Sequence, residues 1–174
     1  MGAGLDRSRS HRRAVGGVHE AAKVTTSERL VELGIELPAV VAPLAAYVPA
    51  VRTGNLVYTS GQLPMVDGAL TQAGKVGAEV TAEEAKGLAR TCALNALAAI
   101  HSLVGVDSVV RVVKVVGFVA SAPGFNGQPG VVNGASELLG DVFGDAGVHA
   151  RSAVGVSELP LNAPVEVELI VEVA

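Results

Sequence analysis

The spacing of apolar positions along this chain predicts helices and strands in alternation. The clearest helix is expected over residues 82–103, where apolar side chains recur every three or four positions. Thr81 and Glu84 form the T-x-x-E pattern of a capping box at its start. Cys92 lies on the apolar face, so we expect it to pack in the core. The predicted buried face consists of Ala85, Leu88, Ala89, Cys92, Ala96, Ala99, Ile100 and Leu103.

Strands are predicted on both sides of this helix. Residues 47–64 hold two apolar stretches around Thr53-Gly54-Asn55, a turn sequence typical of a β-hairpin, and the second stretch should end at Ser60-Gly61-Gln62. Residues 108–121 are rich in valine, which favours a strand. Arg111 and Lys114 lie three positions apart there, so they should point to opposite faces unless a bulge intervenes.

The C-terminal part predicts two more strands, over residues 151–157 and 165–173. The second alternates strictly, which places two sets of side chains on opposite faces of a sheet. One set is apolar and comprises Val165, Val167, Leu169, Val171 and Val173. The other comprises Glu166, Glu168, Ile170 and Glu172.

Two further helices complete the pattern. A short one is expected over residues 26–34, capped by Thr26 or Ser27 and ended by Gly34, and a longer one over residues 131–143. The remaining segments, 65–80, 122–130 and 144–149, are expected to be connections.

The order of the long elements is therefore β-β-α-β-α-β-β, which predicts an α+β fold. One mixed sheet should carry both long helices on one face. The other face bears valines and carboxylates and needs either solvent or another subunit, so we expect oligomerisation.

Length and composition favour one compact domain. The chain has 174 residues, of which 49% are hydrophobic and 3% aromatic, and no apolar run is long enough to span a membrane. Residues 1–24 carry five Lys or Arg against two Asp or Glu, a net charge of +3. The net charge of −4 for the whole chain leaves −7 for the remainder, which argues against a phosphate-binding surface.

Residues 1–24 are expected to form a basic flexible tail, and residues 25–174 a single domain. The segment RSRSHRR has no apolar core, so it is not a secretory signal; a misassigned start or a weak nucleic-acid tail are the alternatives to a flexible tail. With one cysteine no intrachain disulfide can form, which fits a reducing, cytoplasmic setting.

Several familiar catalytic motifs are missing from the sequence. Gly74-Lys75 does not have phosphate-loop spacing, and the four histidines, at positions 11, 19, 101 and 149, show no paired metal spacing. No nucleophile elbow or dinucleotide fingerprint occurs. Nucleophilic, zinc and redox-cofactor enzymes are therefore disfavoured.

Arg151 opens the first C-terminal strand and has two readings. It can be a surface or ion-paired charge, or it can be a carboxylate receptor, because a guanidinium offers a planar set of donors that fits a carboxylate. Glu166 can likewise be one of three solvated strand carboxylates or a catalytic group. Composition alone leaves both alternatives open.

The sequence resembles a known family in two stretches, YVPAVRTGNLVYTSGQLP and ARSAVGVSELPLNAPVEVEL. Together they are similar to the Rid family of enamine and imine deaminases, also called the YjgF/YER057c/UK114 or L-PSP family. The resemblance covers about residues 45–174, and residues 25–45 would be an N-terminal helical extension. The matching positions are Tyr47, Thr59 to Gln62, Asn133, Arg151-Ser152, Leu159-Pro160 and Val165 to Glu168.

This resemblance implies a chorismate-mutase-like α+β fold that assembles as a homotrimer, with the second sheet face buried on trimerisation and the active sites between subunits. It implies hydrolysis of reactive 2-enamine or 2-imino acids to 2-keto acids and ammonia, without a metal or organic cofactor. Two alternatives stay open: a non-catalytic trimer that binds a keto or amino acid, and, less favoured, an endoribonuclease or translation inhibitor.

The resemblance also implies roles for particular residues. Arg151 would hold the substrate carboxylate, and Glu166 would orient or deprotonate a water and later pass a proton to the departing nitrogen. Beside the guanidinium, Glu166 should have a lowered pKa. Tyr47, Ser60 and Gly61 would complete the pocket, and Asn133 would be either a substrate contact or a structural hydrogen bond.

Three departures from the family pattern indicate a divergent subgroup. Ala153 stands where many members have a cysteine, two residues after the arginine. The glycine-rich segment 121–130 also differs from the usual one. The N-terminal 45 residues, including ERLVELGIELP, are an addition. The change at Ala153 alters the pocket wall, and the three departures together predict a substrate that differs from that of other members.

Overall fold

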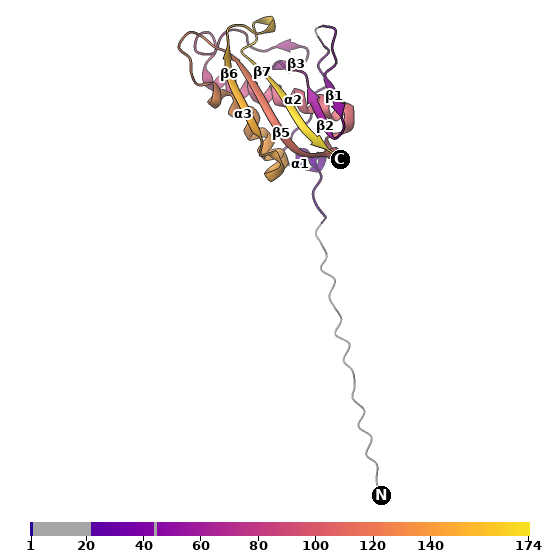
Figure 1. Ribbon diagram of the computed structural model, residues 1–174. Coiled ribbons are helices and arrows are strands. Elements are labelled where there is room, and N and C mark those ends of the chain that lie inside the picture. The colour runs from indigo at the N-terminus through magenta and orange to yellow at the C-terminus, as the bar shows by residue number, and fades with distance from the viewer. Residues whose placement is uncertain (2–21, 44) are drawn as a thin grey trace.

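The computed structural model describes residues 1, 22–43 and 45–174. The predicted tail over residues 1–24 lies almost entirely outside these described residues, so its flexibility stays a prediction. The described part contains one five-stranded sheet with helices packed on it (Figure 1).

The sheet has the strand order β1-β2-β7-β5-β6. β5 and β6 run parallel, and every other neighbouring pair is antiparallel, which confirms the predicted mixed sheet. The C-terminal strand β7 lies at its centre (Figure 1). The strands are β1 (Ala50–Thr53), β2 (Leu56–Thr59), β5 (Val109–Ala120), β6 (Ala150–Val156) and β7 (Val165–Val173).

A second, two-stranded sheet was not predicted. β3 (Met65–Val66) and β4 (Ala69–Leu70) form a small hairpin within the stretch expected to be a plain connection. Asp67 and Gly68 both adopt positive φ, as the turn of a two-residue hairpin requires. The Asp-Gly pair was the available signal for this turn.

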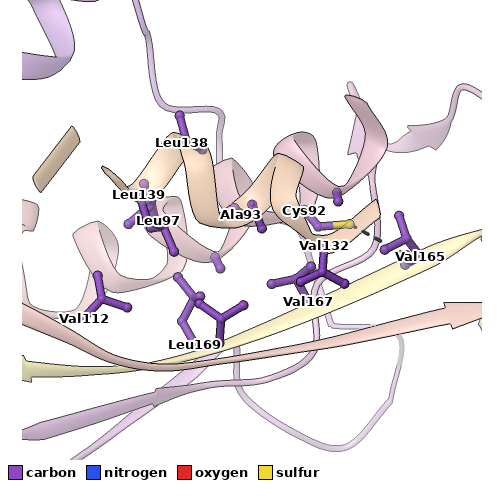
Figure 2. Close-up of a cluster of buried hydrophobic side chains, with 14 of the residues drawn as sticks. Cys92, Ala93, Leu97, Val112, Val132, Leu138, Leu139, Val165, Val167 and Leu169 are labelled. Carbon is purple, nitrogen blue, oxygen red and sulfur yellow. Dashed lines mark hydrogen bonds between the residues drawn. The ribbon is translucent and has the colours of Figure 1, made fainter. Parts of the chain in front are cut away.

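Both long helices lie on one face of the large sheet (Figure 2), as predicted. α2 (Ala82–Val104) begins with the expected capping box of Thr81 and Glu84. α3 (Gln128–Phe143) packs against it at Gly134, where a Cβ atom would overlap the backbone carbonyl of Lys86. A glycine at this position therefore sets how closely the two helices approach.

The core lies between these helices and the sheet (Figure 2). The five odd-numbered residues of β7, from Val165 to Val173, are all buried against the helices. Cys92 is buried as predicted, and its Sγ donates to the Val165 carbonyl at 3.6 Å. Leu103 does not belong to the buried face, because it is 45% exposed in the last turn of α2.

α2 is long and apolar enough to cross a membrane by length and composition, but half of its most apolar window is buried inside the domain. Burial against β7 and α3 is what a core helix of a compact domain requires.

The helix ends differ from the prediction in two places. α1 (Thr26–Glu32) is capped by Thr25, whose side chain accepts from the Glu28 amide, and not by Thr26 or Ser27. α3 begins three residues before the predicted start, because Pro129 in its first turn is compatible with a helix start. Three short 3₁₀ helices fill the connections, at Val106–Ser108 (η1), Gly144–Gly147 (η2) and Pro160–Asn162 (η3).

A β-bulge in β5 changes which face its charged residues occupy. The register against β7 shifts between Val112 and Lys114. Arg111 pairs with Glu172 before this shift and Lys114 pairs with Ile170 after it, so both cations share the face turned away from the helices. This is the exception that the prediction of opposite faces allowed for.

The face of the sheet turned away from α2 and α3 is partly apolar and open. Its pattern is set by β7, whose even-numbered residues Glu166 to Glu172 lie on it. Val51, Tyr58 and Val154 are 53%, 42% and 44% exposed there. An apolar sheet surface of this kind is what a partner subunit would cover.

Candidate active site

The predicted site residues fall into two groups on different parts of the sheet. Arg151 and Asn133 lie together where β6 meets α3, and we call them the arginine group. The second group comes from the segment before β1, the segment after β2 and the start of β7, and we call it the carboxylate group. It consists of Tyr47, Ser60, Gly61 and Glu166.

The side chain of Arg151 points toward the helices and is held by α3. Its Nη1 donates to Asn133 Oδ1 at 2.7 Å and to Ser136 Oγ at 3.2 Å, and its Nη2 donates to the Pro129 carbonyl at 3.2 Å. Asn133 and Ser136 are three residues apart, so they share one side of the helix. The guanidinium is thus fixed by three acceptors from successive turns of α3.

All three acceptors of Arg151 are neutral. Among the described residues, no Asp or Glu forms an ion pair with this half-buried arginine. Three of its five N–H groups are occupied, while its Nε–H and one N–H of Nη2 have no partner within the described chain. A fixed cation with free donors is suited to bind an anion from outside the chain.

Glu166 lies on the open face at the start of β7. The segment from β2 to Gln62 runs alongside β7 with an irregular register. Tyr58 pairs with Ile170 but Gln62 pairs with Val167, which leaves one extra residue in this segment opposite β7. Gly61 lies in this bulge, where a Cβ atom would overlap Glu166 Oε1. The absence of a side chain at position 61 is therefore what gives the carboxyl group its place.

Burial raises the pKa of Glu166 above its ordinary value, and the neighbouring Glu168 carboxylate raises it further. The expectation of a lowered pKa is therefore wrong for the single chain. The physical reason is that the Arg151 guanidinium, which was expected to stabilise the Glu166 carboxylate, belongs to the arginine group and lies too far away to do so within one chain. A carboxyl group with a raised pKa is a better proton acceptor than an ordinary one.

Tyr47 and Ser60 lie close to Gly61, as expected for parts of one pocket. Tyr47, Gly61 and Gln62 line a small cavity of about 30 Å³, whose wall also includes Met65. Ser60 Oγ donates to the Val48 carbonyl at 2.6 Å, which ties the bulge to the segment that carries Tyr47. The two residues thus support one side of a pocket near Glu166.

The arginine and carboxylate groups are too far apart to act on one small molecule within a single chain. Arg151 pairs with Val115 of β5, on the helix side, whereas Glu166 pairs with Phe118 on the open side. β5 separates their two strands, so they are about 10 Å apart across the sheet and about 10 Å along it. Their side chains also leave opposite faces.

Two polar residues beside Arg151, Ser136 and His149, were not predicted from the sequence. Ser136 Oγ lies 2.9 Å from His149 Nε2, and His149 Nδ1 lies 2.6 Å from the Gly147 carbonyl. The histidines were considered as metal ligands alone. The position of His149, two residues before Arg151 and directly before β6, was the available signal.

A larger cavity of about 500 Å³ lies elsewhere, between α1, the start of β5 and the end of α3. It contains none of the predicted site residues. One of its two carboxylates, Asp107, already accepts from the Ser27 amide and hydroxyl at 2.7 Å each, which lowers its pKa and gives it a structural role. Within the described residues, no cluster of His, Cys, Asp and Glu could hold a metal ion.

Comparison with known proteins places the whole described domain in one family. Residues 27–173 match the family model described as "YjgF/chorismate mutase-like, putative endoribonuclease". The match begins inside α1, so it includes most of a helix that was expected to lie outside the resemblance.

Individual relatives and structures agree with this match. Protein TCP17 of Trypanosoma cruzi is 46% identical over 145 residues, which are 82% of this chain and 91% of that protein. The 2-iminobutanoate/2-iminopropanoate deaminase of Dermatophagoides farinae is 34% identical over 140 residues, covering 79% and 93%. The crystal structure of a protein of unknown function from Agrobacterium tumefaciens has 46% identity and a TM-score of 0.79, covering 86% and 92%.

Proposed function

Because the chain belongs to the YjgF/chorismate mutase-like family, we propose that it hydrolyses 2-imino acids, or their 2-enamine forms, to 2-keto acids and ammonia. The observation that carries this proposal is Arg151, a fixed cation with free donors and no ion-pair partner among the described residues. A 2-imino acid carries the carboxylate that such a group binds. The deaminase relative from Dermatophagoides farinae supports the choice of substrate class.

The chemistry requires one water and a group that moves protons. Arg151 holds the substrate carboxylate and so fixes the adjacent C=N carbon in place. As water adds to that carbon, Glu166 accepts one of its protons and passes it to the imine nitrogen, so that a C–O bond forms and a carbinolamine results. Glu166 then carries the proton of the new hydroxyl to the amino group, the C=O bond forms as the C–N bond breaks, and ammonia and the keto acid are released.

This mechanism needs the two groups to come from different copies of the chain. We propose a homotrimer in which the arginine group of one subunit faces the carboxylate group of the next. The exposed apolar side chains of the open sheet face, Val51, Tyr58 and Val154, would be buried by this assembly. The contact would join two different surfaces of neighbouring subunits, and such contacts form a closed ring when the rotation between subunits permits. A ring of three subunits has three equivalent sites.

The proposal is tested by the rate of keto-acid release from imino acids generated in solution by an amino-acid dehydratase. Wild-type protein should accelerate this release. The Arg151→Ala variant should lose about 100-fold or more in kcat/KM, because two hydrogen bonds to a carboxylate are lost. Lys75→Ala, which removes an exposed ion pair with Glu158, is the matched control and should keep its activity.

Two other outcomes would replace this proposal. Binding of a keto acid without turnover would indicate a small-molecule binding protein that uses the same arginine. RNA cleavage by the purified protein would support the endoribonuclease named in the family description. The second is disfavoured by the net charge of −7 over residues 25–174, because RNA binding depends on neutralising phosphates.

A further inference from the structure

We propose that His149 and Ser136 are positioning residues that orient the Arg151 guanidinium for the substrate carboxylate. This inference rests on the proposed function, because it assigns a role to groups that lie behind the arginine. It concerns a chain of hydrogen bonds that runs from Arg151 through Ser136 and His149 to the backbone at Gly147.

With a neutral imidazole, the partners fix the direction of each hydrogen bond in this chain. The Gly147 carbonyl can only accept, so His149 Nδ1 carries the proton and donates to it over 2.6 Å. In the neutral ring Nε2 then carries no proton, and it accepts a hydrogen bond from the Ser136 hydroxyl at 2.9 Å. The oxygen of Ser136 therefore turns a lone pair toward Arg151 Nη1 at 3.2 Å.

The far end of the chain is rigid. A Cβ atom at Gly147 would overlap the Leu139 carbonyl oxygen, so the backbone of this loop packs directly on α3. Gly147 is buried, and its close packing determines where its own carbonyl lies. α3 carries both the backbone on which Gly147 packs and the hydroxyl of Ser136. His149 therefore bridges two groups, the Gly147 carbonyl and the Ser136 hydroxyl, that are both fixed by this helix.

The near end determines which donors of Arg151 stay free. Ser136 and Asn133 together occupy both N–H groups of Nη1. The free donors are then on Nε and Nη2. Without the imidazole, the Ser136 hydroxyl could rotate to donate to its own helix, and its lone pair would no longer be held toward Arg151. The guanidinium would lose one of its three supports and some of its orientation.

The test compares two replacements of the same imidazole. In His149→Asn the amide nitrogen takes the place of Nδ1, so the bond to Gly147 can form while the bond to Ser136 is lost. In His149→Gln the longer side chain can still accept from Ser136. His101→Gln, at the C-terminal end of α2, is a matched control for removing a histidine elsewhere.

The measurement is the Kd for pyruvate, the keto acid that 2-iminopropanoate would yield, by isothermal titration calorimetry on the full chain. His149→Asn and Ser136→Ala should each weaken binding about 5- to 10-fold, the size expected for a lost orienting hydrogen bond. His149→Gln should weaken it less than about 3-fold, and His101→Gln not at all. KM should rise in parallel while kcat changes little.

Methyl pyruvate, which lacks the carboxylate, should bind the wild type and these variants equally weakly. If the wild type binds pyruvate and Arg151→Ala abolishes this, yet His149→Asn and Ser136→Ala bind as the wild type does, the positioning role is overturned and the proposed function stands. If the wild type itself neither binds pyruvate nor turns over imino acids, the proposed function fails first. Equal losses in the Asn and Gln variants, tracking their thermal stability, would show a structural role and also overturn the inference.

Discussion

The arginine group and the carboxylate group differ in how the chain supports their charges. Arg151 is held by three neutral acceptors on α3. Among the described residues, no donor bonds to Glu166, which is half-buried beside Gly61 and next to a second carboxylate. One group is therefore built for a fixed positive charge, and the other for a carboxyl group that gains and loses a proton easily.

This difference indicates a division of labour. A supported cation binds an anion without reorganising, which suits substrate recognition. A poorly stabilised carboxylate has a raised pKa, which suits proton transfer. Changes in the carboxylate group should therefore reduce kcat, whereas changes in the arginine group should weaken binding.

Glu166→Gln should have the largest effect on kcat, a loss of about 100- to 10,000-fold, because the general base is removed. The Kd for pyruvate should stay within about 3-fold of the wild type, since Arg151 is untouched. Single-turnover kinetics together with calorimetric binding would separate the two quantities. A large loss of pyruvate binding in this variant would contradict the division between the two groups.

The same variant should not be less stable at neutral pH. A raised pKa means that ionisation of Glu166 is less favourable in the folded than in the unfolded chain, so this ionisation lowers stability at pH values above the folded pKa. The penalty disappears as the pH falls through that pKa. Glutamine carries no charge, so a thermal unfolding midpoint equal to or above that of the wild type is expected.

Gly61→Ala should have an intermediate effect. The new methyl group would displace the Glu166 carboxyl, which is the end of a flexible side chain, so activity should fall about 10-fold with a small change in stability. Gly87→Ala is the matched control, because Gly87 lies in α2 and a Cβ atom there contacts nothing. Unchanged kcat in Gly61→Ala, with Gly87→Ala also unchanged, would show that the position of this carboxyl is not critical.

Glu168→Gln should have the smallest effect. It removes the secondary cause of the raised pKa of Glu166, so that pKa should fall toward its ordinary value while burial keeps it above. The acid limb of the kcat/KM profile should then shift slightly to lower pH. A pH–rate profile measures this, and a shift to higher pH would contradict the assigned coupling.

The secondary structure followed from local patterns, because period and capping are properties of adjacent residues. The capping box at Thr81 and the alternation of β7 were sufficient for α2 and the central strand. The Asp67-Gly68 hairpin was missed although its turn signal was present. Leu103 was misplaced because periodicity does not show where a helix leaves the core.

The site was predictable in its residue types but not in its grouping. The family resemblance brought Arg151 and Glu166 together, and it could do so without stating which subunit supplies each. The register of β5 against β6 and β7 separates them within the chain. The support from Ser136 and His149 depends on the packing of Gly147 on α3, a tertiary contact that helical or strand periodicity does not encode.

The central claim is that the two groups meet between subunits, and mixing two inactive variants tests it most directly. Arg151→Ala and Glu166→Gln proteins would be unfolded together in equal amounts, refolded into mixed oligomers and assayed for imino-acid hydrolysis. If each site takes its arginine from one subunit and its carboxylate from the next, about one quarter of the sites should be intact and about that share of wild-type activity should return. No recovery, in mixed oligomers shown by mass spectrometry to contain both variants, would contradict the account.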